Sequence, residues 1–202
     1  LVGSEMCIRD RIWNAARFIL MNIEGKDIDC ALPKKLYTSD KWILNRFNNV
    51  TAAVTENLEK FELGMAVSKL YDFIWDDFCD WYIELAKIRM NGADEESADS
   101  ARRVLVWTMS NTLKLLHPFM PYITEEIWQK LPHEGDSIMI SAYPSEMPEL
   151  LFAEEETCME RLIAAIQAIR NRRAEMNVPP SRKAKVYIQT EDMETFSEKS
   201  AV

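Results

Sequence analysis

Glycine is scarce in this sequence, with 5 residues among 202. Scarce glycine, together with long stretches of periodic apolar residues, indicates helices joined by few loops. Hydrophobic residues make up 48% of the chain and charged residues 28%, which is typical of a soluble globular protein. The length suits one large domain, or one domain with a small appendage.

An excess of positive charge is also lacking, since the formal net charge is −9. A protein that coats DNA without regard to sequence is normally basic, because its affinity comes from phosphate contacts. The overall charge therefore argues against a DNA-binding protein of that kind. It does not exclude a local basic surface.

The cysteines form no metal-binding or disulfide pattern. Cys7, Cys30, Cys79 and Cys158 include no C-x-x-C pair, and the two histidines are distant in sequence. We therefore expect no zinc site and no disulfide framework, and a reduced, cytoplasmic setting. No apolar run approaches the roughly 20 residues that span a bilayer, so no membrane association is expected.

Motifs of catalysis and phosphate binding are absent. The sequence has no G-x-G-x-x-G, no Walker A loop, no G-x-S-x-G and no H-E-x-x-H. Asp76-Asp77 and Glu125-Glu126 are adjacent pairs that point to different helix faces, so we interpret them as solvated charges. His117 precedes a proline, where a histidine usually satisfies the end of a helix. We expect no catalytic, cofactor-binding or metal-binding residue in this chain.

Apolar spacing predicts an all-α, antiparallel helical bundle. Steps of three and four residues predict helices at 11–24, 39–64, 65–90, 101–117, 124–131 and from about 154 to 178. The third of these has a heptad-like pattern that suits antiparallel packing. Residues 91–100 are expected to form an acidic loop, and residues 137–141 a brief extended segment.

The two ends of the chain are expected to differ from the bundle. Residues 1–10 show no helical pattern that continues into the next segment, and we interpret them as an unmatched leader that is not native. The bundle domain would then cover residues 11–153. Residues 154–202 would form a basic helix followed by a strand at Lys185–Gln189, the start of a truncated α/β appendage.

Positive charge is concentrated in one segment near the C-terminus. Between residues 161 and 185 there are seven arginines and lysines and one acid, Glu175, which leaves a local charge of +6. Phosphate binding is one interpretation, and a solvated helix end is the other. Arg173 falls in the inward row of this helix with Leu162 and Ile166. It should therefore either form an internal ion pair or emerge toward a partner.

Three strings in the sequence carry a resemblance to a known family. Arg11 to Phe18 reads R-I-W-N-A-A-R-F and resembles the K-L-W-N-A-A-R-F that opens the helical region of valyl-tRNA synthetases. Leu116 to Trp128 reads L-H-P-F-M-P-Y-I-T-E-E-I-W and is similar to a stretch shared by the valine, isoleucine and leucine enzymes. Ile169 to Pro180 reads I-R-N-R-R-A-E-M-N-V-P-P and resembles the valine enzyme most strongly. The resemblance covers residues 11 to 190, with departures at Arg11, where lysine is usual, and at Arg172, where an aliphatic residue is common.

The resemblance implies a module that binds the anticodon stem and loop of valine tRNA. It implies that Arg11 and Arg17 contact the anticodon loop, and we add Arg170 and Arg173 from the basic segment as candidate tRNA-binding residues. The family's ATP site, editing domain and C-terminal arm have no counterpart in this sequence, so this fragment should be inactive alone. The full-length ligase would use ATP and Mg²⁺, and this fragment, as a monomer, would need no cofactor.

Two alternatives remain open at this point. The chain could be the equivalent domain of an isoleucyl-tRNA synthetase, or a helical scaffold that binds proteins and no RNA, which the acidic net charge would suit. A continuous positive surface formed by the four arginines would favour tRNA binding. Arginines that scatter, or that pair with acids, would favour the scaffold.

Overall fold

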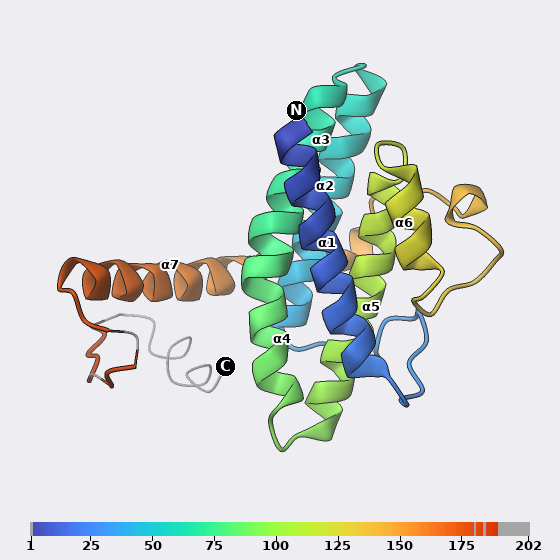
Figure 1. The fold of residues 1–202 in the computed structure, drawn as a ribbon. Coiled ribbons are helices and arrows are strands. Elements are labelled where there is room, and N and C mark those ends of the chain that lie inside the picture. The colour runs from blue at the N-terminus through green and yellow to red at the C-terminus, as the bar shows by residue number, and fades with distance from the viewer. Residues whose placement is uncertain (1, 180, 184, 190–202) are drawn as a thin grey trace.

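The computed structural model describes residues 2–179, 181–183 and 185–189, with side chains from residue 8 onward. Long helices lie side by side in an antiparallel bundle, as predicted (Figure 1). They are α1 (Val2–Ile23), α2 (Thr38–Glu59), the rod formed by α3 (Leu63–Asp72), η1 (Phe73–Tyr82) and α4 (Ile83–Met90), and α5 (Glu95–Leu116). The short helix α6 (Pro121–Trp128) covers one side of the bundle, and α7 (Ala153–Glu175) projects from another side. None of the described helices is long and apolar enough to cross a membrane.

Aromatic and aliphatic side chains from every long helix of the bundle fill its core. Trp42 and Trp128 are almost completely buried, and Phe47 is fully buried. The Phe47 ring meets the rings of Phe73 and Trp107 edge to face, with centroids 6.0 and 5.2 Å apart. Such edge contacts bring the positive rim of one ring to the negative face of another, which adds to the gain from burial.

The first helix begins well before the point that we expected. It starts at Val2, so residues 2–10 are helical and continue directly into the segment that begins at Arg11. The buried Ile8 lies one turn before the buried Ile12, on the same side as Ile19. The expectation that residues 1–10 lack a helical pattern was wrong, because a single isoleucine at the right spacing extends the apolar stripe toward the N-terminus.

The rod from Leu63 to Met90 was predicted as one helix from Met65, and its middle has a different geometry. Residues Phe73 to Tyr82 form a π-helical segment, in which hydrogen bonds join residues five apart. The rings of Phe73 and Phe78, one such step apart, stack with centroids 6.4 Å apart. The preceding helix α2 ends at Glu59 rather than near Gly64, and the chain turns at Phe61 with a φ of 59°.

Helix α5 also begins earlier than the predicted Ala101. Asp94 accepts hydrogen bonds from the backbone N–H groups of Glu96 and Ser97, at 3.1 and 3.3 Å, and so caps the helix. Two acids in its first turn favour the same start, because they lie at the positive end of the helix dipole. Most of the expected acidic loop at 91–100 is therefore helix.

Two segments expected to be extended have other structures. Ser137 caps a short 3-10 turn at Ile138–Ile140, where we expected an extended segment at 137–141. Lys185–Gln189 forms no strand, so that prediction was wrong. A strand needs a neighbour for its backbone hydrogen bonds, and the described part of the chain offers none. The remainder of the expected appendage, residues 190–202, lies outside the described residues.

A row of polar side chains on α2 holds the beginning of α7. Arg46 donates to Asp77 of η1 at 2.9 Å and to Glu156 of α7 at 3.4 Å. Asn45 donates to Glu156 at 2.8 Å, and Lys41 pairs with Glu155 at 2.7 Å. Beyond these contacts α7 leaves the bundle, and the expected inward row from Leu162 to Ile169 is only half-buried.

A buried network centred on Asp40 joins α2, η1, α4, α5 and the segment before α2. The carboxylate is 0% exposed, and it accepts from both Nη atoms of Arg89, at 2.5 and 3.0 Å. The hydroxyls of Tyr82 and Ser100 donate to it at 2.7 and 2.9 Å, and the backbone N–H of Tyr37 donates at 3.1 Å. A buried charge with this many partners is satisfied only in the folded arrangement.

This network should make the protein sensitive to alkali. Burial, and then the neighbouring Asp40 carboxylate, raise the pKa of Tyr82 well above its ordinary value of 10.0. The unfolded chain therefore releases the tyrosine proton at a lower pH than the folded chain does. The stability that the neutral hydroxyl contributes is full below pH 10 and is lost as the pH rises above it, at up to about 1.4 kcal/mol per pH unit.

Urea unfolding at several pH values between 8 and 11 tests this expectation. The free energy of unfolding should fall more steeply with pH in the unaltered chain than in Tyr82→Phe, whose ring cannot ionise. The substitution itself should reduce stability at pH 8 by about 1 kcal/mol, because the hydrogen bond to Asp40 is lost. Parallel pH profiles for the two proteins would show that Tyr82 is not the group responsible.

Candidate nucleic-acid interface

The first of the four candidate arginines, Arg11, is engaged within the bundle. Its guanidinium lies over the Trp75 ring, 4.1 Å from the centroid, and it forms an ion pair with Asp80. Its Nε atom is buried without a hydrogen-bond partner. Arg11 therefore connects α1 to η1, and only the remaining exposed part of its side chain could reach a ligand.

Arg17 lies six residues further along α1, about 9 Å along the axis, and its environment is different. Its side chain is exposed, and no described residue forms an ion pair or hydrogen bond with it. A free, exposed guanidinium presents its planar set of donors to solvent, ready for a phosphate or a base edge.

Arg17 borders a groove between α1 and α6 with a volume of about 350 Å³. The lining consists of Trp13, Ala16, Arg17 and Leu20 from α1, and Ile127 and Lys130 from α6 and the residues after it. The Lys130 ammonium lies 5.1 Å from the centroid of the Trp13 ring and also pairs with Glu126 at 2.6 Å. Two cations thus flank an apolar floor that contains an aromatic ring. Unpaired nucleobases stack on such rings, and their phosphates bind such cations.

The L-H-P-F-M-P string builds the corner that sets α6 beside α1. Pro121 occupies the first turn of α6, where its missing N–H costs nothing. The Thr124 hydroxyl donates to the Met120 carbonyl at 2.9 Å and lies 2.8 Å from Nδ1 of His117. His117, at the end of α5, thus contacts a side chain of α6. Trp128 is buried behind this corner, and Lys130 follows two residues later, next to Trp13.

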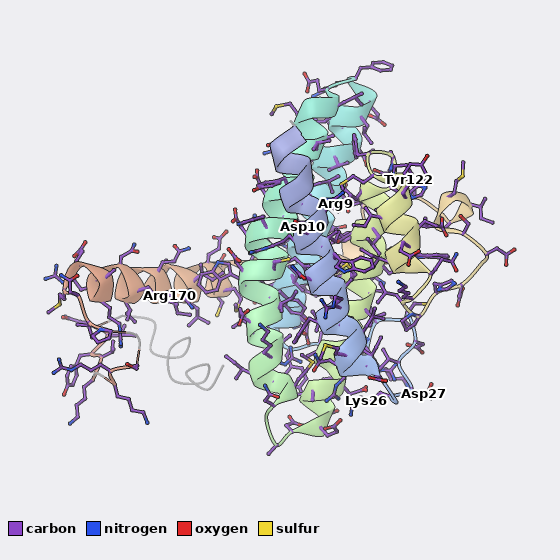
Figure 2. The ribbon with its side chains drawn as sticks, viewed as in Figure 1. Arg9, Asp10, Lys26, Asp27, Tyr122 and Arg170 are labelled. Carbon is purple, nitrogen blue, oxygen red and sulfur yellow. The ribbon has the colours of Figure 1, made fainter. Side chains whose placement is uncertain are left out.

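Arg170 belongs to a separate region. It lies on the projecting helix α7, apart from Arg9 and Asp10 on α1 (Figure 2). Its guanidinium is 5.4 Å from the centroid of the Trp81 ring. It borders a groove of about 1,100 Å³ between α7 and the rod. The acids of this groove are Asp76, Asp77, Asp80, Glu84 and Glu160. A groove with five carboxylates is a poor site for a phosphate.

The guanidinium of Arg173 donates hydrogen bonds to backbone carbonyls. Its Nη2 atom donates to the carbonyl of Pro179 at 2.9 Å and to the carbonyl of Arg182 at 2.8 Å. Both carbonyls belong to the turn that follows α7. We expected Arg173 to form an internal ion pair or to contact a partner. Its hydrogen bonds to backbone carbonyls were not among these expectations.

The structure therefore does not place the four arginines on one continuous surface. Arg17 borders the α1–α6 groove, Arg11 and Arg170 contact tryptophans of η1, and Arg173 lies at the end of α7. Sequence reasoning missed Lys130, which lies just past the end of the second resembling string. Its position beside Trp13 depends on the packing of α6 against α1, and nothing in its local sequence indicates it.

The described residues do not form a metal-binding site. Among the described residues, no three histidine, cysteine, aspartate or glutamate side chains converge as a metal ion requires. Cys30, Cys79 and Cys158 form no disulfide with one another, and burial raises the pKa of the Cys79 thiol to about 11. The side chain of Cys7 lies outside the described residues.

Comparison with known proteins identifies the class to which this fold belongs. Residues 40–188 match the family model described as the anticodon-binding domain of tRNA ligase. The match covers most of the chain, and the chain belongs to this family of anticodon-binding domains. A LeuRS–tRNA–LeuAMS ternary complex from Agrobacterium radiobacter K84 has the same fold over 90% of this chain and 23% of that chain, with a TM-score of 0.53 and 16% identity.

Valine–tRNA ligases are among the proteins similar to this chain. The chain is 48% identical over 188 residues to the Staphylococcus aureus ligase, covering 92% of this chain and 21% of the relative. It is 49% identical over 190 residues to the Listeria innocua ligase, covering 94% of this chain and again 21% of the relative. The chain thus spans about a fifth of the length of these relatives.

Proposed function

We propose that this chain binds the anticodon arm of valine tRNA as the anticodon-binding part of a valine–tRNA ligase. The family match and the identity of 48–49% to valine–tRNA ligases support the class and the amino acid. In the structure, the observation that carries the proposal is the exposed Arg17 beside Lys130 and Trp13 in the α1–α6 groove. Arg17 and Lys130 bind phosphates or base edges of the loop, and the Trp13 ring packs against a base.

The four candidate arginines have different roles in this proposal. Arg17 is the principal contact. Arg11 contributes through the part of its side chain that Trp75 and Asp80 leave exposed. Arg170 sits above the Trp81 ring and supports α7 rather than the loop. Arg173 shapes the end of α7 by its bonds to the carbonyls of Pro179 and Arg182.

We infer that ATP-dependent attachment of valine takes place in parts of the ligase outside this chain. ATP and Mg²⁺ would bind there, and this chain would contribute affinity and selectivity for the tRNA. We further propose that the chain acts as a monomer in the cytoplasm. The scatter of the four arginines, and the ion pair of Arg11 with Asp80, would by themselves favour the protein scaffold. The match to the anticodon-binding family outweighs them, and the exposed Arg17 beside Trp13 and Lys130 supports an RNA ligand.

A filter-binding titration tests the proposal. Valine tRNA should bind at least about tenfold more tightly than the same tRNA with a swapped anticodon, because each mismatched base costs roughly 1–3 kcal/mol. Affinity should also fall as salt rises, since phosphate contacts release counterions. Equal affinity for the two tRNAs would contradict recognition of the anticodon, and no binding even at low salt would favour the scaffold.

A further inference from the structure

The turn that follows α7 is folded back by specific hydrogen bonds. Asn177 adopts a φ of 50°, and the N–H of Val178 donates to the carbonyl of Arg173 at 2.9 Å. This is the usual way in which a left-handed residue ends a helix and reverses the chain. A second bond, from the N–H of Arg182 to the carbonyl of Pro179 at 3.0 Å, closes the next turn.

The Arg173 side chain then holds this turn in place. It donates to the carbonyls of both Pro179 and Arg182, which are the first and last residues of the closed turn. A guanidinium directs several donors in one plane, whereas a lysine ammonium is a single point charge on a flexible stem. The shape of the turn therefore depends on arginine at this position and not on positive charge alone.

The turn that follows α7 is strongly basic among the residues that the structure describes. Arg182, Lys183 and Lys185, which we call the basic turn, are all exposed, and no described residue forms an ion pair with them. The one acid of the segment, Glu175, pairs with Arg172 at 3.0 Å. The helix dipole favours cations within the last turn of α7, but it does not explain three more cations beyond the end of the helix.

The basic turn lies far from the α1–α6 groove. Helix α7 has 23 residues, a length of about 35 Å, and it points away from the bundle (Figure 1). Figure 2 shows side chains with nitrogen ends projecting from the chain that follows α7. A loop of RNA that fills the groove cannot also reach this position. A double-stranded stem presents phosphates along its whole length and can.

We propose that the basic turn is a second RNA contact, which binds backbone phosphates of the stem of the tRNA whose loop occupies the groove. Arg173 is a positioning residue that holds the basic turn in the shape that presents its cations. This inference rests on the proposed function. It assigns RNA contacts to residues other than the four candidate arginines. In this view the α1–α6 groove recognises the bases of the anticodon loop, and the basic turn binds only backbone phosphates of the stem.

The first test removes two charges from the basic turn and compares a matched control. Lys183→Ala/Lys185→Ala should weaken binding of valine tRNA about five- to tenfold at low salt, and should lower the slope of log affinity against log salt by about 1.8, the value for two phosphate contacts to a duplex. The loss should be the same for the anticodon-swapped tRNA, because phosphates carry no sequence. Lys60→Ala/Lys69→Ala removes the same charge from exposed positions on the α2–α3 hairpin and should change affinity less than twofold.

The second test separates position from charge at Arg173. Arg173→Lys keeps the charge but not the planar donors, so it should weaken binding as much as Arg173→Gln does, about threefold to fivefold. In the Lys183→Ala/Lys185→Ala background the same Arg173→Lys change should have a smaller effect, less than about twofold, because only Arg182 of the basic turn is left for Arg173 to position. Circular dichroism should show equal helix content in all variants.

The outcomes distinguish a failure of the inference about the basic turn from a failure of the proposed function. Unchanged affinity and salt slope after the double lysine substitution would overturn this inference and leave the proposed function intact. Wild-type affinity in Arg173→Lys would overturn the positioning role. No binding of either tRNA by the unaltered chain at low salt would overturn the proposed function and this inference together.

Discussion

Replacing Asp40 by alanine should reduce the free energy of unfolding by about 3–5 kcal/mol, the largest effect that we expect of any single polar substitution. The substitution leaves the Arg89 guanidinium, whose side chain is 9% exposed, without its carboxylate. It also removes the acceptor of Tyr82, Ser100 and the backbone N–H of Tyr37. Each of these donors would then be buried with fewer partners, which is costly in a region that water cannot enter.

Urea unfolding followed by circular dichroism measures this loss. Glu56→Ala is the matched control, because it removes a carboxylate of the same helix whose ion pair with Lys60 is exposed. Surface pairs of this kind contribute little, so the urea midpoint of the control should barely move. A loss below 1 kcal/mol for Asp40→Ala would contradict the view that this network holds the segment before α2 against the bundle.

Reversing the charge of Arg17 should cause the largest loss of tRNA binding. We expect Arg17→Glu to weaken binding of valine tRNA about thirtyfold or more, close to 2 kcal/mol, because a charge-assisted hydrogen bond is lost and a repulsion is added. The side chain is exposed and has no partner among the described residues, so the fold should be unaffected. Filter binding measures affinity, and thermal unfolding checks the fold.

Lys69→Glu is the control for this experiment. It makes the same change in charge at an exposed position of α3, away from the α1–α6 groove, and should change affinity less than threefold. If the two variants lose affinity equally, net charge rather than a contact at Arg17 governs binding. If Arg17→Glu binds as tightly as the unaltered chain, the α1–α6 groove is not the site that holds the loop.

The acidic net charge does not describe the charge of any one surface, because some acids and cations cancel each other in ion pairs, whereas Arg17 has no partner among the described residues. Asp40 is paired with Arg89, and Asp80 with Arg11. Glu95 and Glu96 lie in the first turn of α5 and pair with Lys26 and Lys35. A carboxylate with a cationic neighbour contributes little to the field at a distance, so the net charge of the chain says little about any one surface.

The same pairing explains why arginines with similar sequence contexts differ in environment. Arg11 and Arg17 both lie in the first resembling string, yet Arg11 meets Trp75 and Asp80, whereas Arg17 meets no acid. Six residues on a helix correspond to a rotation of 600°, which leaves the two side chains well apart around the axis. Which of the two faces η1 depends on how α1 packs, and a resemblance between strings does not contain that information.

Apolar periodicity determined much of the fold by itself. The helices of the bundle follow from steps of three and four residues, because only a helix brings such positions to one face. The bounds of the last two helices were less well predicted: α6 runs from Pro121 to Trp128 rather than over 124–131, and α7 ends at Glu175, before the predicted 178, because Asn177 takes a left-handed conformation ahead of Pro179. The errors lie where the signal is weak, as at Val2, or where a cap such as Asp94 extends a helix into an acidic segment.

The sequence by itself determined the helical bundle, the family resemblance and the concentration of basic residues between Arg161 and Lys185. Only the tertiary structure decided which cations of the whole chain are available to a ligand. It placed Lys130 beside Trp13, left Arg17 exposed, and turned the Arg173 guanidinium onto two backbone carbonyls. The physical reason is that availability depends on neighbours that are distant in sequence, and charges interact strongly only over the few ångströms that packing of the helices sets.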